Sequence, residues 1–402
     1  MGTYKKTIWL AVICAVVLVL GVAGRFYYQN LRGIGPAIKK PPLQIAEELQ
    51  KNNNLLTVPA GFSADIFAYG LPGARVLLFD SQGNLWVSQT GDGVISKLII
   101  KDNKVDSQQV VFNGLKHPHG LVFDPQNSQI LYIAEENKIS QTIIGANGVA
   151  GPLKKIIDLP KGGNHFTRTL GFGPDNRLYV SIGSTCNVCD EKDPRYASIW
   201  SLNKDGSDFK QVAKGLRNSV FFVFKNNKIW ATEMGRDLLG DNLPPDEINV
   251  IDIQVTSTLN FGWPICYGKN IHDTNFDNKT YFRNPCLDPF EKPSQINLQA
   301  HSAPLGLSFV PENSNWPNSF QGNLLVAFHG SWNRSVPTGY KVVRLILNNQ
   351  GELVKQEDFI TGWLTTTGAL GRPVDLVFDK ADNLFVSDDK AGVIYKLKYT
   401  PK

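Results

Sequence analysis

Histidine and arginine side chains recur at one matched position along this chain of 402 residues. Each lies a few residues ahead of a phenylalanine that ends a short apolar segment. These residues are His117 and His119 before Phe123, His165 before Phe172, Arg217 and Asn218 before Phe224, His301 and Ser302 before Phe309, and Arg372 before Phe378. A neutral histidine can act as a general base, and arginine binds carboxylates through two hydrogen bonds. The pattern therefore predicts a pocket for a polyanionic ligand or cofactor with a base beside it.

The phenylalanines belong to a sequence motif, here called the phrase, that occurs six times in the chain. In each copy an apolar segment ending in Phe is followed by a turn and a second apolar segment. The six phenylalanines are Phe79, Phe123, Phe172, Phe224, Phe309 and Phe378. Turn residues between two apolar segments predict an antiparallel hairpin. One such unit cannot bury its own apolar faces, so the copies must pack around an axis, which predicts an all-β, six-bladed β-propeller.

In a propeller the innermost strand of each blade lines the central channel. The histidines and arginines that precede these strands should therefore converge on one axial pocket. Insertions at about residues 254–300 and within 310–322 enlarge two of the repeats, and long loops on a rigid scaffold often carry functional residues. The segment Phe62–Phe67 could complete the last blade and close the ring.

An acidic stretch follows the fourth hairpin. It contains Glu233, Asp237, Asp241 and the run Asp246–Asn249, with a turn at Gly235. Carboxylate and carbonyl oxygens are the ligands that Ca²⁺ prefers. A calcium site and a solvated acidic loop both remain open from this pattern alone.

The N-terminus differs from the rest of the chain. Lys5 and Lys6 precede an uncharged run from Ile8 to Gly24, and Arg25 follows it. At about 1.5 Å per residue this run reaches about 25 Å, slightly less than a hydrocarbon core of about 30 Å. It is either a membrane anchor or a signal peptide, and both place the remainder of the chain outside the cytoplasm. If residues 8–24 are an anchor, we expect it to lie in the inner membrane, with the rest of the chain in the periplasm. We divide the chain into residues 1–25 (anchor or signal), 26–57 (linker, with a short helix expected at 43–56) and 58–402 (propeller).

Cysteine usage agrees with export. Besides Cys14 there are four cysteines, and an even number in an exported domain indicates disulfides. Four cysteines allow three pairings, of which proximity favours Cys186–Cys189 and Cys266–Cys286. The net charge of +5 is spread over the chain without a basic stripe, so we expect no nucleic-acid partner.

Several short motifs together resemble the glucose/sorbosone dehydrogenases that use pyrroloquinoline quinone (PQQ), with the closer likeness to the sorbosone branch. The resemblance covers about residues 58–397. The motifs are Gly162–Arg168, Phe172–Asp175, Leu178–Gly183, Gly215–Asn218, Asp246–Asn249, Asn260–Pro264, Ala303–Gly306, His329–Arg334, Arg372–Asp375 and Ser387–Asp389.

The resemblance implies a six-bladed propeller that oxidises an aldose or sugar aldehyde with PQQ and Ca²⁺. It makes His165 the base that takes a proton from the sugar hydroxyl at C1, and Arg217 and Asn218 the pair that contacts the quinone carbonyl. It makes Arg334 a partner of a cofactor carboxylate, and it assigns the metal to the segment with Gly235 and Arg236; we add Asp246 to that set. The position of the polar residues ahead of the phenylalanines adds Arg372 and His119 as cofactor contacts.

Two departures from the family pattern concern the surroundings of the base and of the metal. Asn164 stands where the glucose enzymes have Asp, and Leu238–Pro245 lengthens the metal loop. The sequence has no Cys-x-x-Cys-His motif for a fused cytochrome, so a separate acceptor, a quinone or a cytochrome, should receive the electrons. Two other functions remain open: a Ca²⁺-dependent, lactonase-like hydrolase and a non-catalytic ligand-binding propeller.

Overall fold

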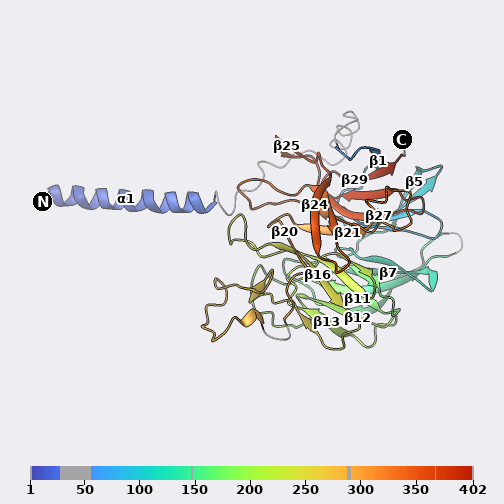
Figure 1. The fold of residues 1–402 in the computed structure, drawn as a ribbon, viewed down its shortest axis with the longest axis horizontal. Helices are drawn as coiled ribbons and strands as arrows, with labels where there is room; N and C mark the ends of the chain where they lie inside the picture. The colour runs from blue at the N-terminus through green and yellow to red at the C-terminus, as the bar shows by residue number, and fades with distance from the viewer. Residues whose placement is uncertain (1, 28–55, 146–147, 288–290, 367, 401–402) are drawn as a thin grey trace.

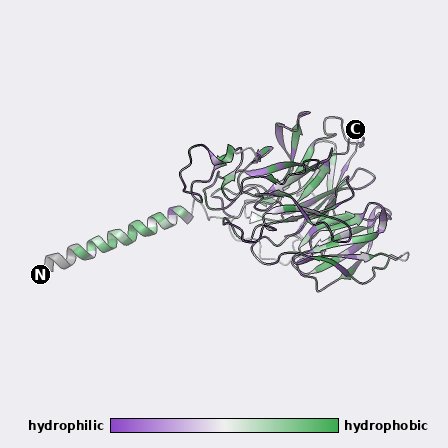
Figure 2. Cartoon of the chain, turned by 90° about the horizontal axis from the view of Figure 1, so that it is seen from below, coloured by the Kyte–Doolittle hydropathy of each residue, from purple (hydrophilic) through white to green (hydrophobic). Residues whose placement is uncertain are grey.

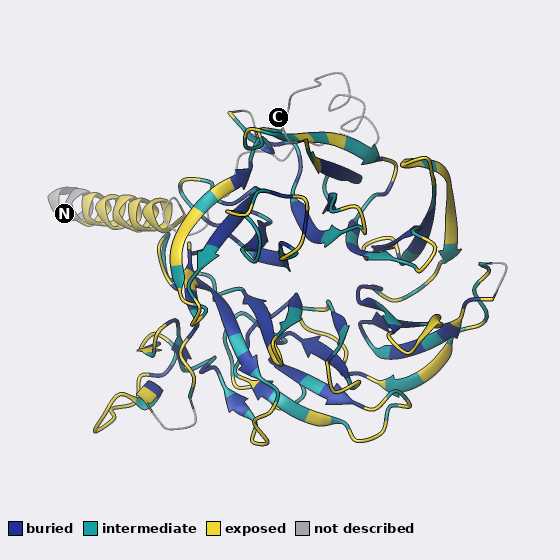
Figure 3. Cartoon of the chain, turned by 45° about the vertical axis from the view of Figure 1, so that its right-hand side comes forward, coloured by how far each residue is buried: buried dark blue, intermediate teal, exposed yellow. Residues whose placement is uncertain are grey.

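The computed structural model describes residues 2–27, 56–145, 148–287, 291–366 and 368–400. Its strands form six main sheets that surround a central axis as blades, with each sheet running from the axis to the rim (Figure 3). The predicted all-β, six-bladed propeller is therefore confirmed. The helix expected at residues 43–56 lies almost wholly outside the described residues.

The first three blades follow one another along the chain (Figure 1). The first contains β2 (Ala74–Phe79), β3 (Leu85–Gln89), β4 (Val94–Lys101) and β5 (Lys104–Phe112). The second contains β6 (Leu121–Asp124), β7 (Asn127–Glu135), β8 (Lys138–Ile143) and β9 (Lys154–Asp158). The third contains β10 (Leu170–Phe172), β11 (Leu178–Ile182), β12 (Ser198–Leu202), β13 (Lys210–Lys214) and β17 (Leu259–Asn260), which pairs in parallel with β13.

The remaining blades carry the insertions and close the ring. The fourth contains β14 (Phe222–Lys225), β15 (Lys228–Glu233), β16 (Asp246–Asp252) and β20 (Ile296–Leu298). The fifth contains β21 (Pro304–Phe309), β22 (Leu324–Phe328), β23 (Lys341–Leu347) and β24 (Leu353–Ile360). The sixth contains β27 (Pro373–Phe378), β28 (Leu384–Asp388), β29 (Val393–Tyr399) and the N-terminal strand β1 (Phe62–Ala68). Because β1 pairs antiparallel with β29, the predicted closing strand is confirmed.

The repeated phenylalanines join neighbouring blades. Each packs edge-on against an aromatic ring of the preceding blade, with ring centroids between 5.1 and 6.0 Å apart. The pairs are Trp86–Phe123, Tyr132–Phe172, Tyr179–Phe224, Trp230–Phe309, Trp316–Phe378 and Phe385–Phe79. Edge-to-face aromatic pairs contribute about 0.5–1.5 kcal/mol beyond the burial of their area. The sequence phrase thus encodes the contact that holds one blade to the next.

The insertion at residues 310–322 takes part in this aromatic packing. In the other five copies an aromatic residue of the second strand supplies the partner ring, whereas Leu325 occupies that position in the fifth blade. Trp316 of the insertion replaces it, is 2% exposed, and donates its indole N–H to the carbonyl of Asp382 at 2.9 Å. This insertion therefore supports the core.

The insertion at residues 254–300 carries two short strands, β18 (Cys266–Tyr267) and β19 (Ile271–His272), and the 3₁₀ turn η2 (Pro285–Leu287). The disulfide Cys266–Cys286 closes it, and a second disulfide joins Cys186 to Cys189, so both expected pairings form. A further small hairpin, β25 (Leu364–Thr365) with β26 (Gly368–Ala369), lies ahead of the sixth blade.

The N-terminal helix α1 (Gly2–Phe26) extends away from the propeller (Figure 1). Its ribbon has the colour of hydrophobic residues along most of its length (Figure 2). The stretch Ile8–Phe26 is long and apolar enough to cross a membrane, and it is exposed throughout. A signal sequence has the same properties, so the anchor and the signal peptide remain the two interpretations of this helix.

Candidate active site

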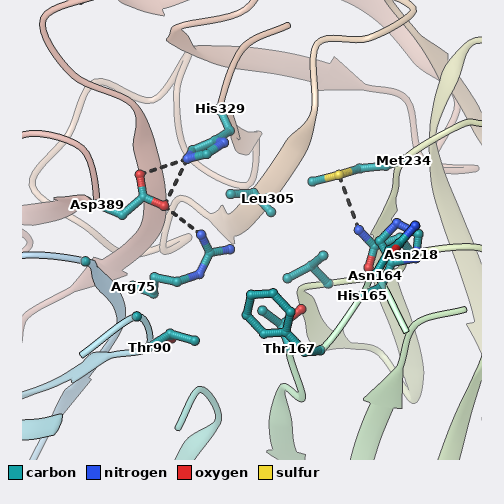
Figure 4. Close-up of a pocket in the computed structure, with 14 residues that line it drawn as sticks. Arg75, Thr90, Asn164, His165, Thr167, Asn218, Met234, Leu305, His329 and Asp389 are labelled. Carbon is teal, nitrogen blue, oxygen red and sulfur yellow. Dashed lines mark hydrogen bonds and ion pairs between the residues drawn. The ribbon is translucent and has the colours of Figure 1, made fainter. Parts of the chain in front are cut away.

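A cavity of about 360 Å³ lies where the inner strands begin. This volume falls within the range of roughly 300–1,000 Å³ that is typical of small-molecule sites. Every blade except the second contributes to its lining. The polar lining residues are Arg75, Thr90, Asn164, His165, Thr167, Asn218, His329 and Asp389 (Figure 4).

His165 lines this cavity with its ring orientation fixed from behind. Its Nδ1 lies 2.9 Å from both the carbonyl oxygen and the hydroxyl oxygen of Ser184. The Ser184 hydroxyl donates its own proton to the carbonyl of Cys186 at 2.7 Å. Both Ser184 oxygens therefore accept, so Nδ1 of His165 carries the proton. Nε2 is left with a lone pair, as a general base requires.

The electrostatic surroundings keep His165 neutral. Burial lowers its pKa, and the nearby positive charge of Arg217 lowers it further, to about 3. The ordinary value for histidine is about 6.5. At neutral pH the imidazole is therefore neutral, and its Nε2 is available to accept a proton.

Gly183 allows His165 and Asn218 to approach each other. It directly follows β11, between the two side chains. A Cβ at this position would lie 2.6 Å from the Cβ of His165 and 2.8 Å from Oδ1 of Asn218. Real Cβ contacts essentially never fall below 3.0 Å, so glycine is required for this arrangement.

Arg217 and Asn218 take different positions. Asn218 lines the cavity, with its backbone N–H donated to Glu233 at 2.7 Å and its side-chain amide 3.5 Å from the sulfur of Met234. Arg217 is buried in the wall, and it borders a neighbouring cleft of about 20 Å³ instead of the main cavity. Its guanidinium donates to Asn187 and Met234 and pairs with Asp237 at 3.1 Å. Of this predicted pair, only Asn218 faces the cavity.

The opposite wall carries a charged cluster that the sequence reasoning did not select. Asp389 accepts a hydrogen bond from Arg75 at 2.7 Å and from Nε2 of His329 at 2.9 Å (Figure 4). Burial alone would raise the pKa of Asp389, but His329 and the charge of Arg75 hold it below its usual range. The cluster thus presents an arginine and a histidine to the cavity, with an ionised carboxylate behind them.

Part of this cluster could have been found from the repeat. Arg75 lies four residues before Phe79, the same offset as His119 before Phe123, so a complete comparison of offsets would have included it. His329 and Asp389 directly follow the second strands β22 and β28, so no count back from a phenylalanine reaches them.

Two predicted cofactor arginines do not line the cavity. Arg372 lies behind the cluster and donates to the backbone carbonyls of His329, at 3.0 Å, and of Gly330. Arg334 donates to the carbonyls of Asp241 and Ala300 in the adjacent loop. The first supports the cavity wall, whereas the second is engaged outside the cavity.

His119 is fully buried and is also absent from the cavity lining. Its Nδ1 is 3.3 Å from the hydroxyl of Thr169, and its ring packs edge-on against Phe221. Burial, with the charge of Arg75, lowers its pKa well below the usual value. Among the described residues its Nε2 has no hydrogen-bond partner.

The residues expected to hold a metal border the small cleft or lie beside it. Both carboxylate oxygens of Asp246 already accept hydrogen bonds, from Gly235 N–H at 2.9 Å and from Ser302 and Ala303. The side chain of Arg236 pairs with Asp273 at 2.9 Å. The backbone carbonyls of Gly235 and Arg236 accept no hydrogen bond from the part of the chain that the structure describes. The carbonyls therefore suit a calcium ion better than the Asp246 carboxylate does.

The side chains fit a planar, polyanionic cofactor. Arg75 offers N–H donors on one wall, with His329 bound to Asp389 beside it, while Asn218 and the neutral His165 face them across the cavity (Figure 4). In the described residues, the two close groups of three His, Cys, Asp or Glu side chains each contain a disulfide pair. A metal at this site would therefore depend on carbonyl oxygens.

Comparison with known proteins gives consistent relatives. The TrAA12-like family matches residues 56–400. An uncharacterized protein of Borreliella burgdorferi is 32% identical over 372 residues, which cover 88% of this chain and 93% of that protein. The PQQ-dependent sugar dehydrogenase of Hypocrea jecorina is 26% identical, with 88% and 93% covered. The PQQ-dependent pyranose dehydrogenase of Coprinopsis cinerea is 25% identical over 85% of this chain. The chain spans only about half of that relative, 54% of its length.

Solved structures agree on the fold. The PQQ domain of the Coprinopsis cinerea pyranose dehydrogenase, in its holo form, superposes with a TM-score of 0.73 at 23% identity, covering 85% of this chain and 97% of that domain. The calcium structure of the Trichoderma reesei AA12 enzyme gives 0.73 at 22% identity, with 86% and 97% covered.

Proposed function

Because the chain belongs to the TrAA12-like family of PQQ-dependent sugar dehydrogenases, we propose that it oxidises an aldose or a related sugar aldehyde, with His165 as the base. One observation carries the role of His165. Ser184 binds the Nδ1 proton of His165, so the lone pair lies on Nε2, which makes no contact with Ser184. The residue also lines the cavity.

The proposed reaction begins with a sugar hydroxyl beside His165. Nε2 accepts the hydroxyl proton while the C–H bond of the same carbon weakens and its hydrogen leaves as hydride. Nδ1 keeps its own proton, which stays hydrogen-bonded to Ser184 throughout. The resulting imidazolium lies close to Arg217, whose charge lowers the pKa of His165. That repulsion favours release of the proton after the reaction. The oxidised carbon becomes a lactone from a cyclic aldose, or an acid from the hydrate of an aldehyde, in which added water supplies the hydroxyl.

PQQ, when bound, would supply the acceptor for the hydride, and the family relationship assigns it as the cofactor together with Ca²⁺. Arg75 is our choice for the contact with its carboxylates, because it lines the cavity and keeps N–H groups besides the one it donates to Asp389. Asn218, which lines the cavity, would hydrogen-bond a quinone carbonyl, and Arg217 would add positive charge near the carbonyl oxygen, where negative charge develops. Arg372 and His119 remain predictions for the cofactor shell, whereas the predicted contact with Arg334 competes with Arg75, and a binding measurement on both arginines decides between them.

For calcium we propose the backbone carbonyls of Gly235 and Arg236 as ligands. Asp246 then acts by holding Gly235 in place through its N–H, at 2.9 Å, instead of binding the ion directly. Hard oxygen ligands of this kind are typical for Ca²⁺.

The N-terminal apolar helix and the disulfides support a proposal for the cellular location of the enzyme. We propose that residues 8–24 anchor it in the inner membrane, that residues 26–57 form a linker, and that residues 58–402 form a periplasmic catalytic domain. Two disulfides agree with an oxidising compartment. A separate quinone or cytochrome would then collect the electrons.

The function is tested with the full-length, detergent-solubilised protein incubated with PQQ and Ca²⁺. We expect quinone absorbance to co-purify with the protein, and an artificial dye to be reduced when aldoses are added. Lactone hydrolysis without quinone would instead identify a hydrolase. Failure to take up PQQ would contradict the proposal and favour a non-catalytic binding propeller.

A further inference from the structure

The loop at residues 184–191 carries a disulfide between Cys186 and Cys189, and Asn187 lies inside the closed ring. We propose that Asn187 is a positioning residue: held by this ring, it fixes Arg217 and the segment Met234–Asp237 at the mouth of the propeller. The inference rests on the proposed function to the extent that this segment contains the carbonyls assigned to Ca²⁺.

Asn187 uses both its backbone and its side chain for this contact. Its backbone carbonyl accepts from Nε of Arg217 at 2.8 Å, and its side-chain oxygen accepts from Nη2 of the same arginine at 2.9 Å. The side-chain oxygen also accepts from the backbone N–H of Asp237 at 2.8 Å, and the amide nitrogen donates to the Asp237 carbonyl at 3.2 Å. One asparagine thus connects the third blade with two parts of the fourth.

The segment Met234–Asp237 is held at both of its ends by these contacts. Arg217, itself bound to Asn187, donates to the Met234 carbonyl at 3.3 Å, while Asn187 binds both backbone groups of Asp237. Gly235 and Arg236 lie between the two ends. Asp237 also accepts from Asn333 at 2.8 Å, which extends the connection to the fifth blade. The position of the two middle carbonyls therefore depends on Asn187.

The same loop also supports the base. The Ser184 hydroxyl that faces His165 donates to the carbonyl of Cys186 at 2.7 Å. The Thr185 hydroxyl donates to Glu191 at 2.9 Å. The disulfide restricts the backbone between these anchors, so less conformational entropy is lost when Asn187 makes its contacts. Opening the ring should loosen the metal segment more than it loosens the fold.

The first test compares Asn187→Ala with Asn203→Ala. Asn203 is a matched control, because its side-chain oxygen also accepts from an arginine, Arg177, at 2.9 Å, and that arginine pairs with Asp208, away from the cavity. PQQ binding to the full-length protein is followed by quinone absorbance while Ca²⁺ is varied. We expect the Ca²⁺ midpoint of Asn187→Ala to rise about 10–100-fold, the usual range when a group that orients metal ligands is lost. Asn203→Ala should keep the midpoint of the unaltered protein.

The second test needs neither cofactor nor metal. Amide hydrogen exchange is measured on the cofactor-free protein for peptides that contain residues 234–237. Exchange should accelerate in Asn187→Ala and in the double variant Cys186→Ser/Cys189→Ser, but not in Asn203→Ala. If Asn187→Ala does not fold, Asn187→Asp replaces it: it keeps the oxygen that accepts from Arg217, loses the donor to the Asp237 carbonyl and sets a carboxylate oxygen against that carbonyl, so exchange should again accelerate.

The two tests separate the possible failures. If the unaltered protein binds no PQQ while exchange responds as expected, the proposed function fails and the positioning role of Asn187 stands. If exchange of residues 234–237 is the same in all variants, the positioning role is overturned. An unchanged Ca²⁺ midpoint together with unchanged exchange in Asn187→Ala would likewise overturn it, whereas an unchanged midpoint with faster exchange would overturn the assignment of Ca²⁺ to the Gly235 and Arg236 carbonyls.

Discussion

At the scale of single residues, the cavity is lined by a histidine, His165, whose Nδ1 proton is bound by Ser184. Ser184 holds Nδ1 of His165, and burial together with Arg217 lowers its pKa to about 3. The ring should therefore stay neutral as the pH falls through about 6.5, where an exposed histidine becomes charged. Since the folded protein holds the pKa down, protonation should occur only near pH 3.

This prediction is measured by NMR of labelled histidines in the cofactor-free protein. With six histidines in the chain, each signal can be assigned by substituting one residue at a time. The His165 signals should stay constant from pH 7.5 down to the acid limit of folding. A titration centred near the ordinary value would contradict the geometry described for this residue.

Gly183 gives a second prediction at this scale. Gly183→Ala would place a Cβ 2.6 Å from that of His165 and 2.8 Å from Oδ1 of Asn218. Because displacement of a reacting group by about 1 Å can lower turnover about 10²-fold, we expect a loss of that order in the PQQ-loaded protein. Gly171→Ala is the control: its Cβ would meet Phe222 at 2.9 Å, outside the cavity, so the loss of turnover should be far smaller. Equal turnover losses would contradict the role of Gly183.

The cofactor arginines can be distinguished by binding. Arg75 lines the cavity, whereas Arg334 donates a hydrogen bond to the backbone carbonyl of Ala300. A hydrogen bond to a charged group contributes about 1.5–3 kcal/mol. Arg75→Ala should therefore weaken PQQ binding about 10–100-fold in a fluorescence titration, and Arg334→Ala should leave it nearly unchanged. The reverse order would restore Arg334 as the carboxylate contact.

At the scale of elements, the hairpin repeat explains why the six blades could be predicted from the sequence. The phenylalanine of each copy contacts the preceding blade, so the phrase that repeats in the sequence is the contact that repeats in space. His165 and Asn218 were found because they precede such a strand. His329 and Asp389 follow second strands instead. Antiparallel pairing places the end of each second strand beside the start of the first, so these two residues reach the same mouth although they do not precede a repeat phenylalanine.

Trp316 provides the prediction at this scale. It replaces the ring that the fifth hairpin lacks, and it is 2% exposed among Phe62, Phe359 and Phe378. Trp316→Ala should lower the free energy of unfolding by about 3–5 kcal/mol, as removal of a large buried aromatic residue usually does. Urea denaturation measures this loss, and turnover at low temperature should stay unchanged. A loss of turnover without a loss of stability would instead place residues 310–322 at the active site.

At the scale of the whole molecule, the ring is closed by its own N-terminal strand. Pairing of β1 with β29 joins residues 62–68 to the last blade of the ring. The number of blades, the closing strand and both disulfides could be predicted because they depend on repeats and on proximity in the sequence. The offsets could have selected Arg75 beside Arg217 and Arg372, but they could not predict which of the three faces the cavity, because that depends on how backbone carbonyls compete for each guanidinium.

The fate of α1 is a prediction at the same scale. If residues 8–24 anchor the enzyme, the mature protein keeps its N-terminus and stays in the membrane fraction after a carbonate wash. Deletion of residues 2–26 behind a cleavable secretion signal should release an active, soluble propeller. A mature chain that begins after Gly24 and is soluble would identify α1 as a signal peptide.

The measurement that tests the central claim most directly is the single-turnover reduction of bound PQQ by a sugar, in the unaltered protein and in His165→Ala. Both proteins are first loaded with PQQ and Ca²⁺, and quinone absorbance shows that the load is equal. The rate in His165→Ala should be lower by about 10²–10⁴, the usual contribution of a general base. An unchanged rate at equal PQQ content would contradict the assignment of His165 as the base.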